Sequence, residues 1–405
     1  MSRDILFYLH VHQPFRVKKY SIFDAAVDHE YFNDTSINAD TNNRYIIDKV
    51  SEKSYLPANK KLLEILTKHP EFRLSMSISG VLLEQLKLWR PDVLQTFKDL
   101  VDTGNVELLG ETYHHSLAFF HSKPEFEIQV QMHRQIIKDI FGQSPKVFRN
   151  TELSYNNDLA LWADKAGYDA IITEGWDPVL GWRSPNYLYK PVNTENIKLF
   201  LKNYKLSDDI AFRFSNKDWE GWPLTAEKFT NWINQIDEQE PLVNLFMDYE
   251  TFGEHQWGDT GIFNFLEHLP VEFLKYEKNG FTTFSEALKI HKPMDEIDVQ
   301  NTITWADTER DLSAWLGNKM QQDAIKNLYD LEERIISTND WSLIEDWRKL
   351  QTSDHFYYMC TKWFSDGDVH AYFSPYESPY VAFMSYMNVI RDLELRLKII
   401  EGANL

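Results

Sequence analysis

The chain has 405 residues, of which 62 are acidic and 42 basic, for a formal net charge of -20 at pH 7. This charge repels phosphate backbones and anionic lipids, so it argues against nucleic acid and membrane surfaces as partners. The single cysteine, Cys360, excludes an internal disulfide. Because the start of the chain lacks a secretory signal pattern and no apolar run approaches the roughly 20 residues of a membrane span, we expect a soluble cytoplasmic protein.

Short runs of β-branched and aromatic residues alternate with helical patterns from the start of the chain to about residue 290. Such alternation is the signature of βα units around a parallel sheet. The predicted strands are 5–9, 72–77, 106–109, 147–150, 170–173, 197–201 and 242–248. The predicted helices are 58–68, 81–102, 124–141, 158–166, 226–239 and 261–276. Seven strands indicate an α/β fold with an incomplete (β/α)7 barrel, one strand short of the usual eight.

Helical periodicity replaces the strand pattern after about residue 300. Apolar residues follow the i, i+3, i+4 spacing at Leu312, Trp315, Leu316, Ala324, Leu328, Leu331 and Ile335. This spacing predicts a C-terminal helical bundle. We therefore expect a catalytic barrel domain over residues 1–295 and a helical domain over residues 296–405.

Polar residues follow several of the predicted strands at the point where each strand ends. His10 and His12 follow the first strand, Glu111 follows the third, Glu152 follows the fourth, and Asp248 ends the seventh. In a parallel barrel the carboxyl ends of the strands meet at one mouth, where active sites lie. The sequence therefore predicts that these side chains share a site.

Glu152 and Asp248 are the candidate catalytic pair. Each acid alone could instead cap the helix that follows its strand. Two carboxyls about 5–5.5 Å apart would serve a retaining glycosidase as nucleophile and general acid, and only a shared site could unite residues so distant in sequence. Their spacing does not decide which acid has which role.

Several segments resemble the conserved segments of glycoside hydrolase family 57, the retaining α-glucan-active enzymes. They are residues 10–15, 104–117, 148–156, 247–257, 281–288 and 305–318. The resemblance implies that Glu152 is the nucleophile and Asp248 the general acid/base. Arg149 and His255 stand where some transglycosylating members have Trp, so the chain is more similar to the α-amylase group. Alternatives are a 4-α-glucanotransferase using the same residues and a non-catalytic glucan-binding homologue.

The His10 and His12 pair has a second interpretation, since a His-X-His pair at a strand end can hold a metal ion. Such a site would be completed from Asp248, His114, His115, His121 and His255. The resemblance favours contacts of both imidazoles with sugar hydroxyls. We therefore expect no metal and no cofactor.

The substrate implied by the resemblance is an α-glucan or maltooligosaccharide, and the sequence indicates no oligomeric state. The candidate substrate-binding residues are His10, His12, Glu111, His115, Trp176, His255, Trp257, Asp311 and Trp315. Trp176 follows a glycine beside a predicted strand end, where its flat face could meet a sugar ring. Asp311 and Trp315 come from the family segment in the helical domain, although the apolar stripe alone would explain Trp315 as a core residue.

Overall fold

The computed structural model describes residues 3–362 and 369–402. The chain forms two compact units, which we call the strand unit and the helical unit. The strand unit comprises Met1–His12, Asp48–Glu111 and Met132–Trp305. The helical unit comprises Gln13–Ile47, Thr112–Gln131 and Ala306–Leu405. This division differs from the expected single boundary at residue 295, because two segments from the first third of the chain belong to the helical unit.

The first sheet of the strand unit is entirely parallel. Its strands are β1 (Arg3–Val11), β2 (Leu74–Ile78), β3 (Val106–Leu108), β8 (Leu242–Asp248) and β9 (Asn279–Phe281). The order is β3-β2-β1-β8, and β9 also pairs with β1. Nearly every residue of β1 and β8 is buried, which explains why these strands read as continuous apolar runs.

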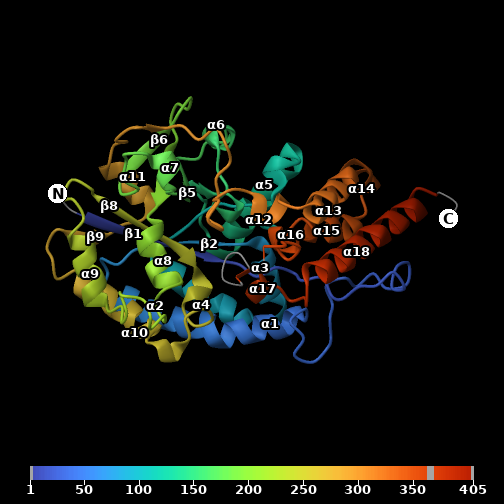
Figure 1. The fold of residues 1–405 in the computed structure, drawn as a ribbon, viewed down its shortest axis with the longest axis horizontal. Helices are drawn as coiled ribbons and strands as arrows, with labels where there is room; N and C mark the ends of the chain where they lie inside the picture. Colours follow the sequence, from blue (N-terminus) through green and yellow to red (C-terminus); the bar gives the residue numbers. More distant parts are fainter. Residues whose placement is uncertain (1–2, 363–368, 403–405) are drawn as a thin grey trace. The chain divides into compact units, whose positions relative to one another are not determined.

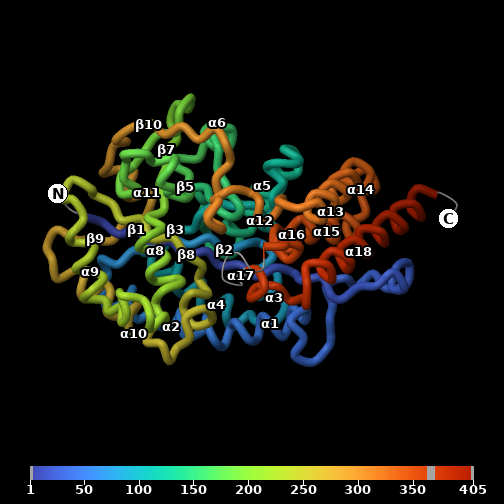
Figure 2. The backbone as a smooth tube through the Cα atoms, in the orientation of Figure 1, coloured from blue at the N-terminus to red at the C-terminus, as the bar shows by residue number. Residues whose placement is uncertain are grey.

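The second sheet contains the other strands of the strand unit. They are β4 (Val147–Arg149), β5 (Ala170–Glu174), β6 (Leu188–Pro191), β7 (Lys198–Lys202) and β10 (Glu296–Ile297), in the order β10-β6-β7-β5-β4. Figure 2 labels β10, β7 and β5 of this sheet. β6 runs antiparallel to β7, whereas β10 runs parallel to β6. The sequence did not predict β6 (Leu188–Pro191), which contains a lysine and ends in proline, or β10, which has only two residues.

Main-chain hydrogen bonds join the two sheets at both edges of the first sheet. Beside β3, the amide of Gly110 donates to Val147 and the amide of Arg149 donates to Gly110, at 2.9 and 2.8 Å. Beside β8, the amide of Asn203 donates to the carbonyl of Asn244 at 2.8 Å. The end of β3 is therefore linked to β4, and the end of β7 to β8.

Helices connect the strands of the strand unit. They are α2 (Leu56–Lys68), α3 (Gly80–Trp89), α4 (Pro91–Asp102), α6 (Asn157–Lys165), α7 (Asp177–Leu180), α8 (Tyr204–Ala211), α9 (Ala226–Asn234), α10 (Ile262–Phe273) and α11 (Phe284–Ile290). Helices α2 and α10 pack together (Figure 1). The single helix predicted over 81–102 is wrong: Arg90 leaves the helical conformation before Pro91, which starts α4 in the position where proline is favoured.

Two of the five unit boundaries fall inside helices, which are α1 (Asn43–Val50) and α5 (Lys123–Phe141). A π-helix over Ser51–Tyr55 continues the chain from α1 to α2.

The helical unit confirms the change to helices in the last part of the chain. Its helices are α12 (Ser313–Leu316), α13 (Lys319–Asp330), α14 (Glu332–Thr338), α15 (Trp341–Lys349), α16 (Ser353–Tyr357), α17 (Val369–Phe373) and α18 (Pro379–Ile400). Its core combines apolar residues of these helices with Val17, Tyr20 and Tyr31. Inside the same unit, buried Arg348 forms an ion pair with buried Glu125, with nitrogen to oxygen distances of 2.9 and 3.1 Å.

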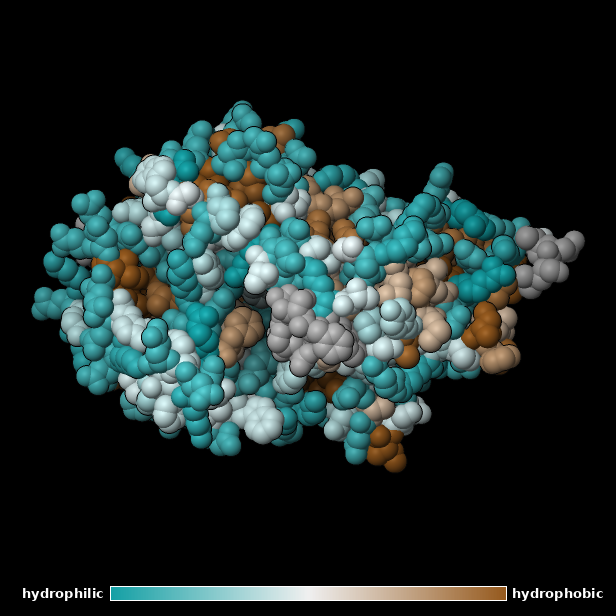
Figure 3. Space-filling view, viewed as in Figure 1, coloured by the Kyte–Doolittle hydropathy of each residue, from teal (hydrophilic) through white to brown (hydrophobic). Residues whose placement is uncertain are grey.

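The face drawn in Figure 3 is mainly hydrophilic, with smaller apolar patches between the polar residues. Among the residues that the structure describes, no helix has both the length and the apolar composition needed to cross a bilayer.

Candidate active site

Glu152 lies just beyond β4, in a short 3-10 turn over Thr151–Leu153. Glu152 and Leu153 both have left-handed backbones, with φ of 60° and 51°. Two such residues in succession are strained unless they are glycine, and strain of this kind collects at functional sites. The turn is held by Trp305, whose indole Nε1 donates to Glu152 Oε2 at 2.9 Å, and by the hydroxyl of Thr173, which donates to the Leu153 carbonyl at 2.8 Å.

Asp248 is the last residue of β8, and the sheet register places it next to a histidine. Asp248 lies opposite His10 of β1, and His10 in turn lies opposite Ser77 of β2. The three residues therefore form a row across the carboxyl ends of three parallel strands. Asp248 is half-buried, as Glu152 is.

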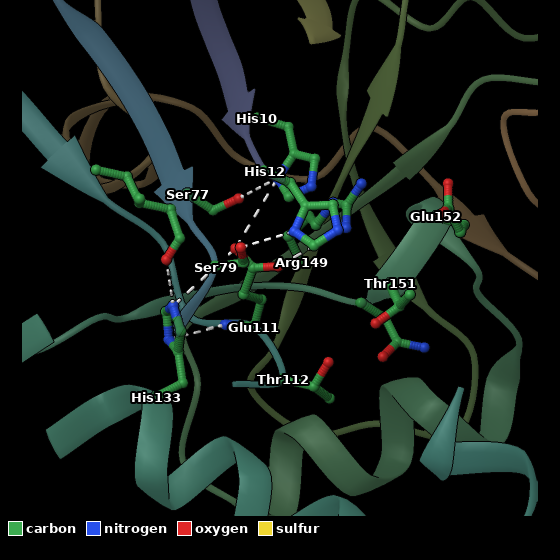
Figure 4. A network of polar contacts seen from close by, with 12 residues as sticks. His10, His12, Ser77, Ser79, Glu111, Thr112, His133, Arg149, Thr151 and Glu152 are labelled. Atoms are coloured by element: carbon green, nitrogen blue, oxygen red, sulfur yellow. Dashed lines mark hydrogen bonds and ion pairs between the residues drawn. The ribbon is translucent and has the colours of Figure 1, made fainter. Parts of the chain in front are cut away.

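The two histidines at the end of β1 are each oriented by a serine. Nδ1 of His10 lies 3.0 Å from the Ser77 hydroxyl, and Nδ1 of His12 lies 2.7 Å from the Ser79 hydroxyl (Figure 4). The Ser77 hydroxyl also lies 2.6 Å from the hydroxyl of Tyr8. Burial raises the pKa of Tyr8 well above its ordinary value, so its phenol stays protonated. The two imidazole rings stack with centroids 5.8 Å apart.

Glu111 is fully buried among three basic side chains (Figure 4). Its carboxylate lies 3.9 Å from His10 Nδ1, 4.0 Å from His133 Nε2 and 3.9 Å from an Arg149 guanidinium nitrogen. Burial lowers the pKa of His133, so this imidazole is neutral. Its Nδ1 accepts from the Glu111 amide and its Nε2 donates to the Ile78 carbonyl. His133 thereby ties the end of β3 to the end of β2.

Trp305 lies among buried charged residues. The Arg149 guanidinium carbon is 5.3 Å from an indole ring centroid, and the Lys202 ammonium is 5.5 Å from it. Lys202 also lies 3.7 Å from Glu174 and 3.1 Å from Asp208. Each buried cation therefore has an acidic partner, which buried charges require.

The loop after β8 carries the next predicted residues. Burial lowers the pKa of His255 to about 4, although the neighbouring Glu254 opposes this shift. A neutral imidazole can both donate and accept a hydrogen bond, as recognition of a sugar hydroxyl requires. Glu254 pairs with Lys49 and Lys53, and Lys53 also lies 5.4 Å from the ring of Trp257, which is 58% exposed.

The sequence profile of glycosyl hydrolase family 57 matches residues 6–300. The chain belongs to this family. It is 44% identical, over 97% of its length and 85% of the other protein, to a Methanocaldococcus jannaschii protein named "Putative alpha-amylase". It is 24% identical to the 4-alpha-glucanotransferase of Thermococcus litoralis over 60% of this chain and 36% of that protein.

Family 57 enzymes also share the fold. The crystal structure of the family 57 branching enzyme from Pyrococcus horikoshii superposes with a TM-score of 0.73 at 14% identity, covering 99% of this chain and 92% of that one. At this identity the likeness shows the fold alone.

Four polar residues near the predicted site residues were not predicted from the sequence, namely His133, Glu174, Lys202 and Trp305. Glu174 and Lys202 end the strands predicted at 170–173 and 197–201. The criterion that identifies Glu152, a polar residue at the end of a predicted strand, therefore applies to both of them. His133 lies within the long helix α5, where nothing in the pattern distinguishes it. Trp305 is the first residue of the family segment 305–318, but the sequence pattern gave no reason to predict it as a site residue.

The remaining predicted residues are divided between the two units. Trp176 is half-buried in the strand unit and precedes α7. His115, Asp311 and Trp315 belong to the helical unit. There, the His115 carbonyl accepts from the amide of Ser353, Asp311 is exposed, and Trp315 is only 1% exposed within the core. This burial explains Trp315 as a core residue of the helical unit.

Proposed function

We propose that this family 57 member is a retaining α-glucan hydrolase of the α-amylase type, with Glu152 as nucleophile and Asp248 as general acid/base. The observation that carries the proposal is the position of both acids at the carboxyl ends of parallel strands, β4 and β8. The M. jannaschii relative, which matches almost the whole chain, carries an amylase name. The strained turn at Glu152 adds support, since such turns recur at active sites.

The site would lie in the mouth of an incomplete (β/α)7 barrel. Seven strands can be followed in the order β4-β5-β7-β8-β1-β2-β3 when the links between the two sheets are included. The bridge between Gly110 and Phe148 would then return the ring from β3 to β4. A ring of this kind would direct the carboxyl ends of its strands into one mouth.

In the reaction, a Glu152 oxygen attacks the anomeric carbon while the Asp248 carboxyl protonates the glycosidic oxygen that leaves. A glycosyl ester on Glu152 forms and the shortened glucan departs. Asp248, now ionised, removes a proton from water, whose oxygen attacks the anomeric carbon and releases Glu152. We assign His10, His12 and His255 to sugar hydroxyls, and Trp176 and Trp257 to sugar faces. No step requires an ion or a cofactor.

A 4-α-glucanotransferase is the second candidate, because relatives of that name match 60% and 52% of the chain. Transfer shares every step up to the glycosyl-enzyme and differs only in the acceptor, a sugar hydroxyl in place of water.

The test replaces each acid by its amide. Glu152→Gln should lower kcat by roughly a thousandfold or more on every substrate, since an amide cannot attack the anomeric carbon. Asp248→Asn should reduce hydrolysis of natural glucans to a similar extent. Its loss should be much smaller on aryl or fluoride glycosides, whose leaving groups need no proton. The measurement is kcat and KM on both substrate types, beside glucan binding to each variant.

Glu107→Gln is the control, because Glu107 lies within β3 and hydrogen-bonds Ser285 rather than any residue of the site. Activity of Glu152→Gln within a few-fold of the parent would reject Glu152 as nucleophile. Equal losses of Asp248→Asn on both substrate types would reject Asp248 as the acid.

A further inference from the structure

We infer that Trp305 is a positioning residue for Glu152. We also infer that the buried cations Arg149 and Lys202 strengthen the hydrogen bond from the Trp305 indole to the Glu152 carboxylate. The inference rests on the proposed role of Glu152 as nucleophile. It assigns a function to Trp305, Arg149 and Lys202, which the reaction steps above do not use.

Trp305 holds Glu152 at two points. The indole Nε1 donates to the side-chain oxygen Oε2 at 2.9 Å, and the Trp305 amide donates to the Glu152 carbonyl at 3.3 Å. The first bond fixes the plane of the carboxylate, and the second fixes the left-handed backbone from which it projects. A nucleophile placed in this way loses little freedom when it reaches the anomeric carbon.

The main chain before Trp305 is itself fixed to the segment that follows Glu152. Tyr155 and Ile303 exchange two main-chain hydrogen bonds, at 2.9 and 3.0 Å, and the amide of Asn157 donates to Val299 at 2.9 Å. Residues 299–305 therefore run antiparallel along residues 152–157. This pairing sets the position of the indole independently of any substrate.

The charges beside the indole favour the ionised form of Glu152. Arg149 is fully buried and Lys202 is 4% exposed, and their charged groups lie 5.3 and 5.5 Å from the ring centroid. Cations at this distance draw electron density from the ring, which makes its N–H a stronger donor. Charge-assisted hydrogen bonds to a carboxylate stabilise its negative form, the form that attacks.

Both cations are held by acids from other strands, so their positions are set by the fold. Arg149 lies 3.9 Å from Glu111, which follows β3. Lys202 lies 3.7 Å from Glu174, the last residue of β5. Residues from the ends of β3, β4, β5 and β7 thus act on Glu152 through the single side chain of Trp305.

The experiment is Trp305→Phe, which keeps an aromatic ring and removes the donor. We expect kcat to fall about 10- to 100-fold, with little change in KM, because the indole supports the nucleophile rather than the substrate. The acidic limb of the pH profile of kcat/KM should move to higher pH, since the ionised carboxylate has lost a donor. A loss of folded enzyme that is equal at every pH does not move that limb, and circular dichroism over the same pH range shows whether the variant unfolds in acid.

Lys202→Met should move the acidic limb in the same direction by a smaller amount, and Lys202→Arg, which keeps the charge, should restore it. Trp162→Phe is the matched control, because Trp162 packs on Phe148 in the same unit, with ring centroids 5.1 Å apart. The acidic limb of the pH profile of Trp162→Phe should lie at the same pH as that of the parent.

A parent-like kcat and pH profile in Trp305→Phe would overturn the inference, provided that Glu152→Gln is inactive. Full activity of Glu152→Gln would instead reject the proposed nucleophile. A shift of equal size in Trp162→Phe would also overturn the inference, because it would show a general effect of replacing tryptophan.

Discussion

Four charged residues with less than 5% exposure gather at the strand ends of one unit: Glu111, Arg149, Glu174 and Lys202. Isolated charges at such depth would be neutralised or excluded from the fold. Here they form two acid and base pairs, and both cations lie beside Trp305. Removing one member of such a pair should cost more stability than replacing both by apolar residues. The presence of these pairs is therefore better explained by the chemistry of the proposed site than by stability.

A second charged cluster, in the helical unit, predicts a pH-dependent stability. The buried Nε2 of His370 lies 3.0 Å from Asp307 and 3.9 Å from the thiol of Cys360. Burial lowers the pKa of His370, but the interactions with Asp307 and Cys360 outweigh it and raise the pKa to about 9. The unfolded value is near 6.5, so the imidazolium stabilises the fold fully below pH 6.5. This contribution is lost as the pH rises through about 9.

Melting temperatures measured from pH 6.5 to about 9 should therefore fall in the parent and change less in His370→Gln. His268→Gln, on an exposed position of α10, is the control and should follow the parent. Parallel pH dependence in the parent and in His370→Gln would show that His370 does not carry the effect.

The backbone of the loop that follows β8 closely approaches the backbone of the π-helix over Ser51–Tyr55. Gly253 has φ of +114°, and a Cβ built there would lie 2.0 Å from the Lys53 carbonyl oxygen of the π-helix. Only glycine can occupy this position without moving one of the two backbones. The same loop carries Glu254, His255 and Trp257, so its placement affects the proposed substrate-binding residues.

Gly253→Ala should destabilise the protein by about 2–4 kcal/mol and raise KM for glucan, because the backbone is strained and the new methyl group meets a carbonyl. Gly258→Ala in the same loop is the matched control, since its Cβ would make only ordinary contacts with Phe263, at 3.6 Å. Thermal melts and kinetics of both variants provide the measurement. Equal behaviour of the two variants would contradict the argument.

At the level of elements, the sequence predicted most of what positions the site. Each of the seven predicted strands overlaps a strand of the structure, because buried parallel strands are mostly apolar and are followed by polar residues. The ends of the fourth and seventh predicted strands led to Glu152 and Asp248. The pattern could not reveal the left-handed turn at Glu152, nor that the indole of Trp305, 153 positions away, would donate to it. Those features arise from tertiary pairing.

At the scale of the molecule, the chain passes between the two units repeatedly rather than once. Val17, Tyr20 and Tyr31 come from the segment Gln13–Ile47 and are buried in the core of the helical unit. A sequence pattern shows that such residues are apolar, but it does not show which core receives them. The net charge of -20 is compatible with a neutral polysaccharide substrate and unfavourable for polyanions.

The choice of acceptor for the glycosyl group, water or a sugar hydroxyl, is a property of the whole molecule. Residues that bind a second sugar chain can come from any part of it. We expect hydrolysis. Incubation with a maltooligosaccharide of one length should release reducing ends in proportion to the bonds broken and give only shorter products. Glu152→Gln should give none. Products longer than the substrate, formed without new reducing ends, would identify a transferase, and binding without any product would identify a non-catalytic glucan-binding protein.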